Sequence, residues 1–164
     1  MTPSEQVAAV FSALPGLFSK AASSLDAIES LLRAKGIERI TPSELIGAER
    51  DAVRSYFDRN VLPIFSPLII DPRHPFPNLR NGALYIVCTL AAASEDEQGL
   101  LGIIEVPSSL PRVVEITRND GQLRYILLGD VILACLESCF GSYVPQDRAV
   151  SASRATPTST RTAT

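Results

Sequence analysis

The sequence predicts an α+β fold, with an N-terminal helical segment followed by a mainly antiparallel sheet that carries a packed helix. Two patterns lead to this prediction. Up to about Val61, apolar residues recur every three or four positions, as they do in amphipathic helices. After Pro63, short apolar runs rich in β-branched residues alternate with turn residues, as they do in sheets. Helices and strands are thus segregated along the chain, which is typical of α+β domains.

The tetrapeptide Thr-Pro-Ser-Glu occurs at residues 2–5 and again at 41–44, and each copy predicts a helix start. The threonine caps the helix, the proline fits the first helical position, and the glutamate reaches back to the N–H of the cap. We expect Pro15 and Gly16 to interrupt the first helix, which then resumes and ends before Gly36. Its apolar seam is suited to packing against another helix. The second tetrapeptide leads, through a short turn, into a helix that begins near Gly47.

Four apolar runs predict strands, at residues 83–91, 100–107, 112–116 and 123–127. The first run, ALYIVCTLA, is almost continuously apolar, so it predicts a strand buried on both faces. It is expected to form a hairpin with the second run. An amphipathic helix is expected to start at Asp130 or one residue earlier, and its inward-facing residues are Ile132, Cys135, Leu136, Cys139 and Phe140.

The composition indicates an ordinary soluble protein. The formal net charge is −3, which does not favour a nucleic-acid partner. The longest apolar stretch, residues 83–93, is far shorter than the roughly 20 residues of a transmembrane helix. The N-terminus lacks the basic and apolar regions of a secretory signal. Three cysteines without framework spacing suit reduced thiols, so we expect a cytoplasmic protein.

The only histidine, His74, lies in the proline-rich stretch IIDPRHPFPNLRN, residues 69–81. Imidazole titrates near neutral pH, so His74 could act as a base or as a phosphorylated nucleophile. The alternative is architectural: each residue before a proline is driven to an extended conformation, which makes a stiff strap. We favour the architectural interpretation and expect Phe76 to pin this strap in a core. Asp71 is the one nearby acidic residue that could orient the imidazole.

Three other groups of residues could carry chemistry, and each has an ordinary structural explanation. Glu95, Asp96 and Glu97 could ligate a hard cation, but a charged hairpin tip is the commoner case. Cys135 and Cys139 could bind a metal, but buried small hydrophobes are favoured. Scattered arginines could contact phosphate, but such arginines are usually solvated. Salt-sensitive binding of a polyanion stays open as a weaker hypothesis. These arginines are Arg73, Arg80, Arg112, Arg118 and Arg124.

Residues 56–81, YFDRNVLPIFSPLIIDPRHPFPNLRN, resemble the long-chain, histidine-phosphorylated polyphosphate kinase family. That family carries a pattern similar to YF…V.P.LTPL..DP.HPFP.L.N. Ser66 of this sequence stands where the family usually has threonine. The likeness continues in VPSSLPRVV (106–114), similar to VP..LPRFV, and in LLGDVILACLESCF (127–140), similar to L.DVI…L..LF. The resemblance covers about residues 2–148. It implies that 1–52 are the end of a helical N-terminal domain and that 53–148 are the first part of a head domain.

The family transfers the γ-phosphate of ATP reversibly onto polyphosphate, through a phosphohistidine and with Mg²⁺. Its histidine nucleophile and metal-associated arginines lie in C-terminal domains that have no counterpart in this sequence, so the resemblance implies that His74 is not the phosphorylated histidine. The family's adenine-contacting motif also finds no match before Thr2. No catalytic, cofactor-binding or metal-ligating residue is therefore assigned here. ATP, Mg²⁺ and polyphosphate are expected only in a full-length enzyme, which can also lie peripheral to the membrane.

We therefore expect a polyphosphate kinase fragment that is inactive alone and has a structural or dimerisation role, with homo-oligomer contacts through the head domain. The alternative is a stand-alone interaction module that dimerises or binds a full-length kinase. Residues 149–164 are expected to be a disordered tail, because the last fourteen, SASRATPTSTRTAT, contain nothing apolar larger than alanine. The possible codons of Ser151–Thr162, read in a shifted frame, permit the family's continuation FRVTR..DL, so this tail is also expected to be frameshifted.

Overall fold

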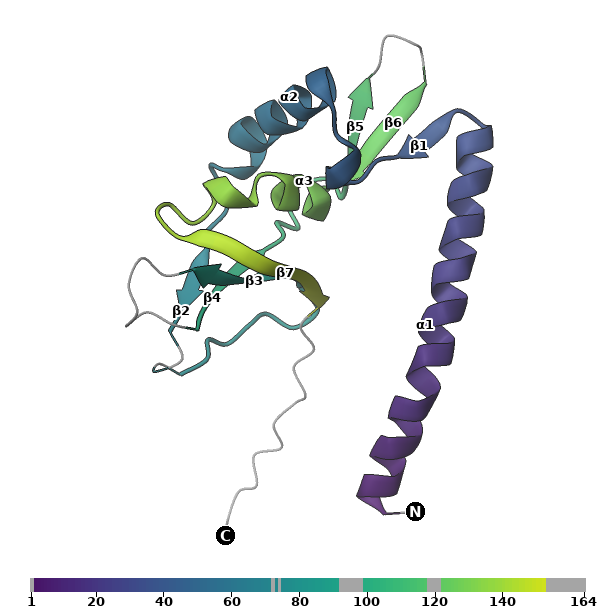
Figure 1. The fold of residues 1–164 in the computed structure, drawn as a ribbon, viewed down its shortest axis with the longest axis vertical. Coiled ribbons are helices and arrows are strands. Elements are labelled where there is room, and N and C mark those ends of the chain that lie inside the picture. Colours follow the sequence, from purple (N-terminus) through teal and green to yellow (C-terminus); the bar gives the residue numbers. More distant parts are fainter. Residues whose placement is uncertain (1, 72, 74, 92–98, 118–121, 153–164) are drawn as a thin grey trace. The chain divides into compact units, whose positions relative to one another are not determined.

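The computed structural model describes residues 2–71, 73, 75–91, 99–117 and 122–152, and it confirms the α+β fold (Figure 1). The chain forms two compact units. The first comprises residues 1–39 and 117–125, and the second comprises 40–116 and 126–164.

The first unit is dominated by the helix α1 (Pro3–Ala34). Its N-terminus is the predicted capping box: the Glu5 N–H donates to Thr2 Oγ1 (3.3 Å) and the Thr2 N–H donates to Glu5 Oε2 (2.7 Å). The predicted interruption at Pro15 is wrong, because α1 runs through that residue without a break. A proline removes one backbone hydrogen bond, and the many helix-favouring residues on both sides sustain the rest of a 32-residue helix.

The strand β1 (Ile37–Arg39) follows α1 after the positive-φ residue Gly36, and no sequence pattern predicted it. It pairs in parallel with β6 (Leu123–Leu127), with Glu38 opposite Arg124. These two residues form an ion pair (2.9 Å), and Arg39 pairs with Glu29 of α1 (3.1 Å). β5 (Val113–Thr117) completes the order β1-β6-β5. The strands predicted at 112–116 and 123–127 are therefore both present, and they lie next to each other.

The second unit contains a four-stranded sheet of order β2-β4-β3-β7. β2 (Leu68–Ile70) and β3 (Leu84–Ala91) both run antiparallel to β4 (Leu100–Glu105), so the predicted hairpin of the first two runs is confirmed. The fourth strand, β7 (Val144–Ala152), pairs antiparallel with β3. Residues 149–152, which the sequence places in a disordered tail, therefore belong to a strand; residues 153–164 lie outside the described residues.

Helices cover one face of this sheet. A 3₁₀ turn (Pro42–Glu44) leads into α2 (Gly47–Tyr56), as predicted, and a π-helical turn (Phe57–Val61) continues it. The short helix α3 (Leu128–Ala134) is followed by a 3₁₀ turn (Leu136–Ser138). All five residues predicted to face inward on this segment are buried: Ile132, Cys135, Leu136, Cys139 and Phe140.

The strand β3 is packed on both faces, which confirms the interpretation of its continuous apolar run. Ile86, Cys88 and Leu90 belong to the large core shared with α2 and α3. Tyr85 belongs to a smaller cluster with Ile70, Ala83 and Ile103 on the other face. Two concavities of the unit lie at the start of this strand, directly after the proline-rich strap.

Candidate functional site

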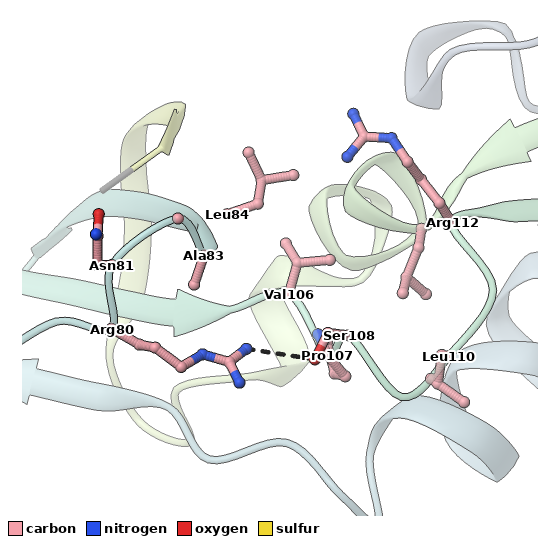
Figure 2. Close-up of a pocket in the computed structure, with 11 residues that line it drawn as sticks. Arg80, Asn81, Ala83, Leu84, Val106, Pro107, Ser108, Leu110 and Arg112 are labelled. Carbon is pink, nitrogen blue, oxygen red and sulfur yellow. Dashed lines mark hydrogen bonds between the residues drawn. The ribbon is translucent and has the colours of Figure 1, made fainter. Parts of the chain in front are cut away.

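The strap and the segment after β4 enclose a cavity of about 510 Å³ in the second unit (Figure 2). Residues 80–84 form one wall, at the end of the strap and the beginning of β3. Residues from 106 to 112 form the opposite wall, in the connection from β4 to β5. Arg80, Asn81, Ser108 and Arg112 supply the polar groups, and the apolar lining is Ala83, Leu84, Val106, Pro107, Leu110 and Leu128.

A second concavity of about 380 Å³ adjoins the first and shares Arg80 and Pro107 with it. It is lined by the segment before β2 and by the strap, together with Tyr85 and Glu105. Arg80 therefore stands between the two hollows, and its side chain is more than half exposed. A ligand in either concavity would lie within reach of this guanidinium.

A hydrogen-bonded network holds Arg80 in this place. Its backbone N–H donates to the Tyr85 hydroxyl (2.8 Å), and that hydroxyl donates to Glu105 Oε2 (3.1 Å). The Arg80 guanidinium forms an ion pair with Glu105 Oε1 and donates to Ser108 Oγ (3.3 Å). Tyr85 and Glu105 are direct cross-strand partners on β3 and β4. The rigid sheet thus orients the last part of the strap, and Figure 2 shows the Arg80 side chain directed at Ser108.

Arg112 differs from Arg80 in its surroundings. Its backbone carbonyl accepts from the Leu128 N–H (2.8 Å), which fixes the main chain at the wall of the cavity. Its guanidinium is exposed, and among the described residues no side chain forms an ion pair or hydrogen bond with it. In Figure 2 the Arg112 side chain leaves the wall on the side away from Arg80. Counting only the described residues, the cavity therefore has one arginine with a carboxylate partner and one without.

The structure brings together two of the five arginines that the sequence singled out. Arg73 instead forms a bidentate pair with Asp71 (2.6 Å for Nη2–Oδ2) within the strap. Arg124 is only 8% exposed and pairs with Glu38 in the first unit, so it holds β6 to β1 and is not available to a phosphate. Arg118 lies outside the described residues.

The strap itself differs from its predicted role in one respect. Phe76 is 60% exposed, so the prediction that it pins the strap in a core is wrong. The strap is anchored by the backbone of Arg80 at Tyr85 and by Leu79, which packs against the smaller cluster. His74 lies outside the described residues, and so do Glu95, Asp96 and Glu97. Their predicted roles stay predictions.

The cysteines are core residues, as predicted. Cys88, Cys135 and Cys139 are buried. Burial, and to a smaller extent the neighbouring Cys135, raises the pKa of the Cys139 thiol from its ordinary value of 9.0 to about 12. The pKa values of the other two thiols are also raised, chiefly by burial. Such thiols stay protonated at neutral pH and are poor nucleophiles. Within the described residues there is also no group of three potential metal ligands.

Arginines, a hydroxyl and an amide around the larger cavity can bind an anion and neutralise its charge. They offer no acid–base pair and no activated nucleophile for bond making. Sequence reasoning found both arginines but missed Tyr85, Glu105 and Ser108. The cross-strand register that brings Tyr85 to Glu105 has no local signal, because it depends on pairing between segments distant in the chain.

Comparisons with known proteins give one consistent answer. Residues 48–152 match the family model described as the polyphosphate kinase middle domain. A polyphosphate kinase of Bacillus cereus is 35% identical over 115 residues, which are 68% of this chain and 16% of that protein. One of Exiguobacterium sibiricum is 29% identical over 144 residues, which are 87% of this chain and 20% of the relative.

Among solved structures, the crystal structure of polyphosphate kinase from Porphyromonas gingivalis is similar, with a TM-score of 0.69 and 26% identity. The likeness covers 76% of this chain and 20% of that one. The chain thus spans about a fifth of the length of the proteins that it matches. In the described residues, no helix is long and apolar enough to cross a membrane.

Proposed function

The chain belongs to the polyphosphate kinase family, and we propose that it is a non-catalytic part of such an enzyme, with a structural role in contacts between subunits. The observation that carries the proposal is the chemistry of the cavity between the strap and the β4–β5 connection. Arg80 and Arg112 supply charge there, yet no described lining residue offers a nucleophile with a base beside it. Phosphoryl transfer needs such groups, or a metal and a phosphate cradle, in one place.

Within this proposal, ATP, Mg²⁺ and the growing polyphosphate react on other parts of a full-length enzyme. The middle-domain match and the coverage of about a fifth of the relatives support that division of labour. The proposal also places the chain in the cytoplasm, where its three buried thiols would stay reduced. Homo-oligomer contacts through the head domain, residues 53–148, are part of the same proposal.

An activity assay tests the catalytic half of this proposal. The purified chain is incubated with ATP and Mg²⁺, and polyphosphate is quantified beside an intact polyphosphate kinase of the same family as the positive control. We expect no product above the blank from the chain alone. Turnover that co-purifies with the chain and scales with its concentration would refute the proposal.

A second candidate is an interaction module that dimerises or binds a full-length kinase. It is favoured by α1, in which no residue is buried although its apolar residues recur along one face. Phe11 and Phe18 are each 67% exposed. Light scattering of the chain mixed with an intact kinase separates the candidates, because a module gives a complex of defined mass and an inert fragment gives the two separate masses.

A further inference from the structure

We propose that α1 forms an antiparallel coiled coil with the α1 helix of a second copy of this chain. The contact surface is the apolar seam of α1, which consists of two rows of residues that recur every seven positions. The first row is Val7, Leu14, Ala21 and Ile28, and the second row is Phe11, Phe18, Leu25 and Leu32. The inference rests on the second candidate above, the module that dimerises, and it adds the orientation and the register of the pair.

The seam lies open in the first unit. No residue of α1 is buried by the described part of the chain. In Figure 1, α1 is one unbroken helix. Its 32 residues make it about 48 Å long, at 1.5 Å per residue. Because exposed apolar surface of this length is unfavourable in water, the seam gains from a partner that covers it along its whole length.

The spacing of the seam indicates that this partner is a helix. Apolar residues at a strict seven-residue repeat drift slowly round a straight helix, which has 3.6 residues per turn. They stay on one contact line when two helices supercoil around each other. Both rows keep the repeat through four successive positions, from Val7 to Leu32. A flat surface needs no such repeat.

The sizes of the side chains favour the antiparallel orientation. In a parallel pair each seam residue meets its own copy, so two Phe18 rings would crowd one layer and two Ala21 methyl groups would leave another underfilled. In an antiparallel pair the first row meets the second row, and Phe18 can face Ala21 of the second copy. That register also matches the remaining seam residues: Phe11 with Ile28, Leu14 with Leu25, and Val7 with Leu32.

The flanks of the seam agree with this orientation. One flank carries Val10, Leu17 and Leu31, which are all exposed. In an antiparallel coiled coil each flank lies beside the same flank of the other helix, so these apolar residues cover one another. In a parallel pair they would lie beside the other flank, which carries smaller or charged residues such as Ala22 and Glu29. The helix dipoles also oppose each other favourably in the antiparallel pair.

A lipid surface is the other occupant that an exposed apolar helix face suggests. Helices that lie on membranes are rich in Lys and Arg on the polar face, and these residues bind anionic lipids. α1 has two basic residues against three acidic ones: Lys20 and Arg33 against Glu5, Asp26 and Glu29. Its charge therefore favours a protein partner.

Exchange of a large and a small residue tests the pairing of Phe18 with Ala21, and sedimentation equilibrium of the full chain measures dimerisation. We expect Phe18→Ala and Ala21→Phe each to weaken dimerisation about tenfold, because one leaves a cavity and the other overfills the layer. The double variant restores one large and one small residue in each layer, so it should dimerise within about threefold of the unaltered chain. Ala9→Phe is the matched control: it adds the same ring at an exposed position on the opposite side of the helix and should leave dimerisation unchanged.

Disulfide trapping tests the orientation. Full chains that carry Val7→Cys or Leu32→Cys are mixed and treated with oxidised glutathione. In the proposed register the two introduced thiols face each other, whereas the two copies of position 7 lie about 37 Å apart along the pair, beyond the reach of a disulfide. We expect a linked dimer from the mixture and none from Val7→Cys alone. The unaltered chain is the control, because its three cysteines are buried and should stay unlinked.

Three results would overturn the inference. They are cross-linking of Val7→Cys alone as efficiently as of the mixture, a double variant that dimerises no better than the single variants, and a chain that binds phosphatidylserine vesicles but stays monomeric without them. A dimer of another orientation refutes only this inference and leaves the second candidate standing, whereas a monomeric chain refutes both. None of these results bears on the activity assay, so failure here and failure of the non-catalytic proposal are distinguishable.

Discussion

Gly102 of β4 lies where the sheet meets the segment that follows α3. A Cβ atom placed on this residue would lie 2.5 Å from Phe140 Cζ and 2.8 Å from Cys88 Sγ. Both neighbours are buried in the main core, so neither can move aside freely. We predict that Gly102→Ala lowers the free energy of unfolding by about 1–3 kcal/mol, the usual cost of overpacking. Urea denaturation of the full chain measures this change.

A second glycine provides the control for that measurement. Gly129 lies in the first turn of α3, and a Cβ there would meet no atom within 4 Å. We expect Gly129→Ala to leave stability unchanged or to raise it by up to about 1 kcal/mol, because alanine loses less backbone entropy in a helix. Equal effects of the two substitutions would contradict the packing argument at Gly102.

At the scale of elements, the pairing of β3 with β4 positions the strap through the side-chain hydroxyl of Tyr85. Tyr85 is buried, and its hydroxyl both accepts from the Arg80 backbone and donates to Glu105. Tyr85→Phe leaves the Arg80 N–H without this partner, so we predict a loss of about 1–2 kcal/mol of stability. We also expect faster amide exchange at Arg80, which hydrogen-exchange mass spectrometry measures.

Tyr143→Phe is the control. Tyr143 is half-buried and packs against the core of the same unit. Its hydroxyl makes no hydrogen bond to a described residue, so the substitution removes none of those bonds. Unchanged exchange at Arg80 would contradict the anchoring role.

The elements that sequence patterns predicted are those with a local signal, either a run of buried apolar residues or a helix cap. The β3 run, the inward face after Leu127 and the capping box of α1 all match the structure. Sequence patterns missed β1 because it has only three residues, and they missed β7 because it is mostly polar. Both segments become strands only by pairing, β1 with β6 and β7 with β3. The same limit applies to the site: Arg80 and Arg112 were visible as cations, but no local pattern shows that they share a cavity or that Arg124 belongs to an ion pair elsewhere.

At the scale of the whole molecule, the exposed apolar face of α1 should control self-association. Its exposed large apolar residues follow a three-and-four spacing along one side of the helix: Val7, Val10, Phe11, Leu17, Phe18, Leu25, Ile28 and Leu31. Contiguous apolar surface of this kind marks an interaction site or an aggregation liability. We therefore predict that the chain forms oligomers at micromolar concentration in light scattering after size-exclusion chromatography.

Substitution on α1 tests whether this face is responsible. Burying a phenylalanine side chain contributes about 1.5–3 kcal/mol, so replacing Phe11 and Phe18 with lysine should weaken association by more than tenfold. Ser19→Lys adds a charge to an exposed position of the same helix, off the run of large apolar residues, and should leave the mass distribution unchanged. If the double variant associates as strongly as the unaltered chain, the contacts lie elsewhere, and homo-oligomer contacts through the head domain, residues 53–148, become the explanation to test. If the unaltered chain is monomeric at every concentration, the interaction-module candidate loses its main support. In that case the exposed face of α1 does not associate even with a second copy of itself, so it gives no reason to expect a partner.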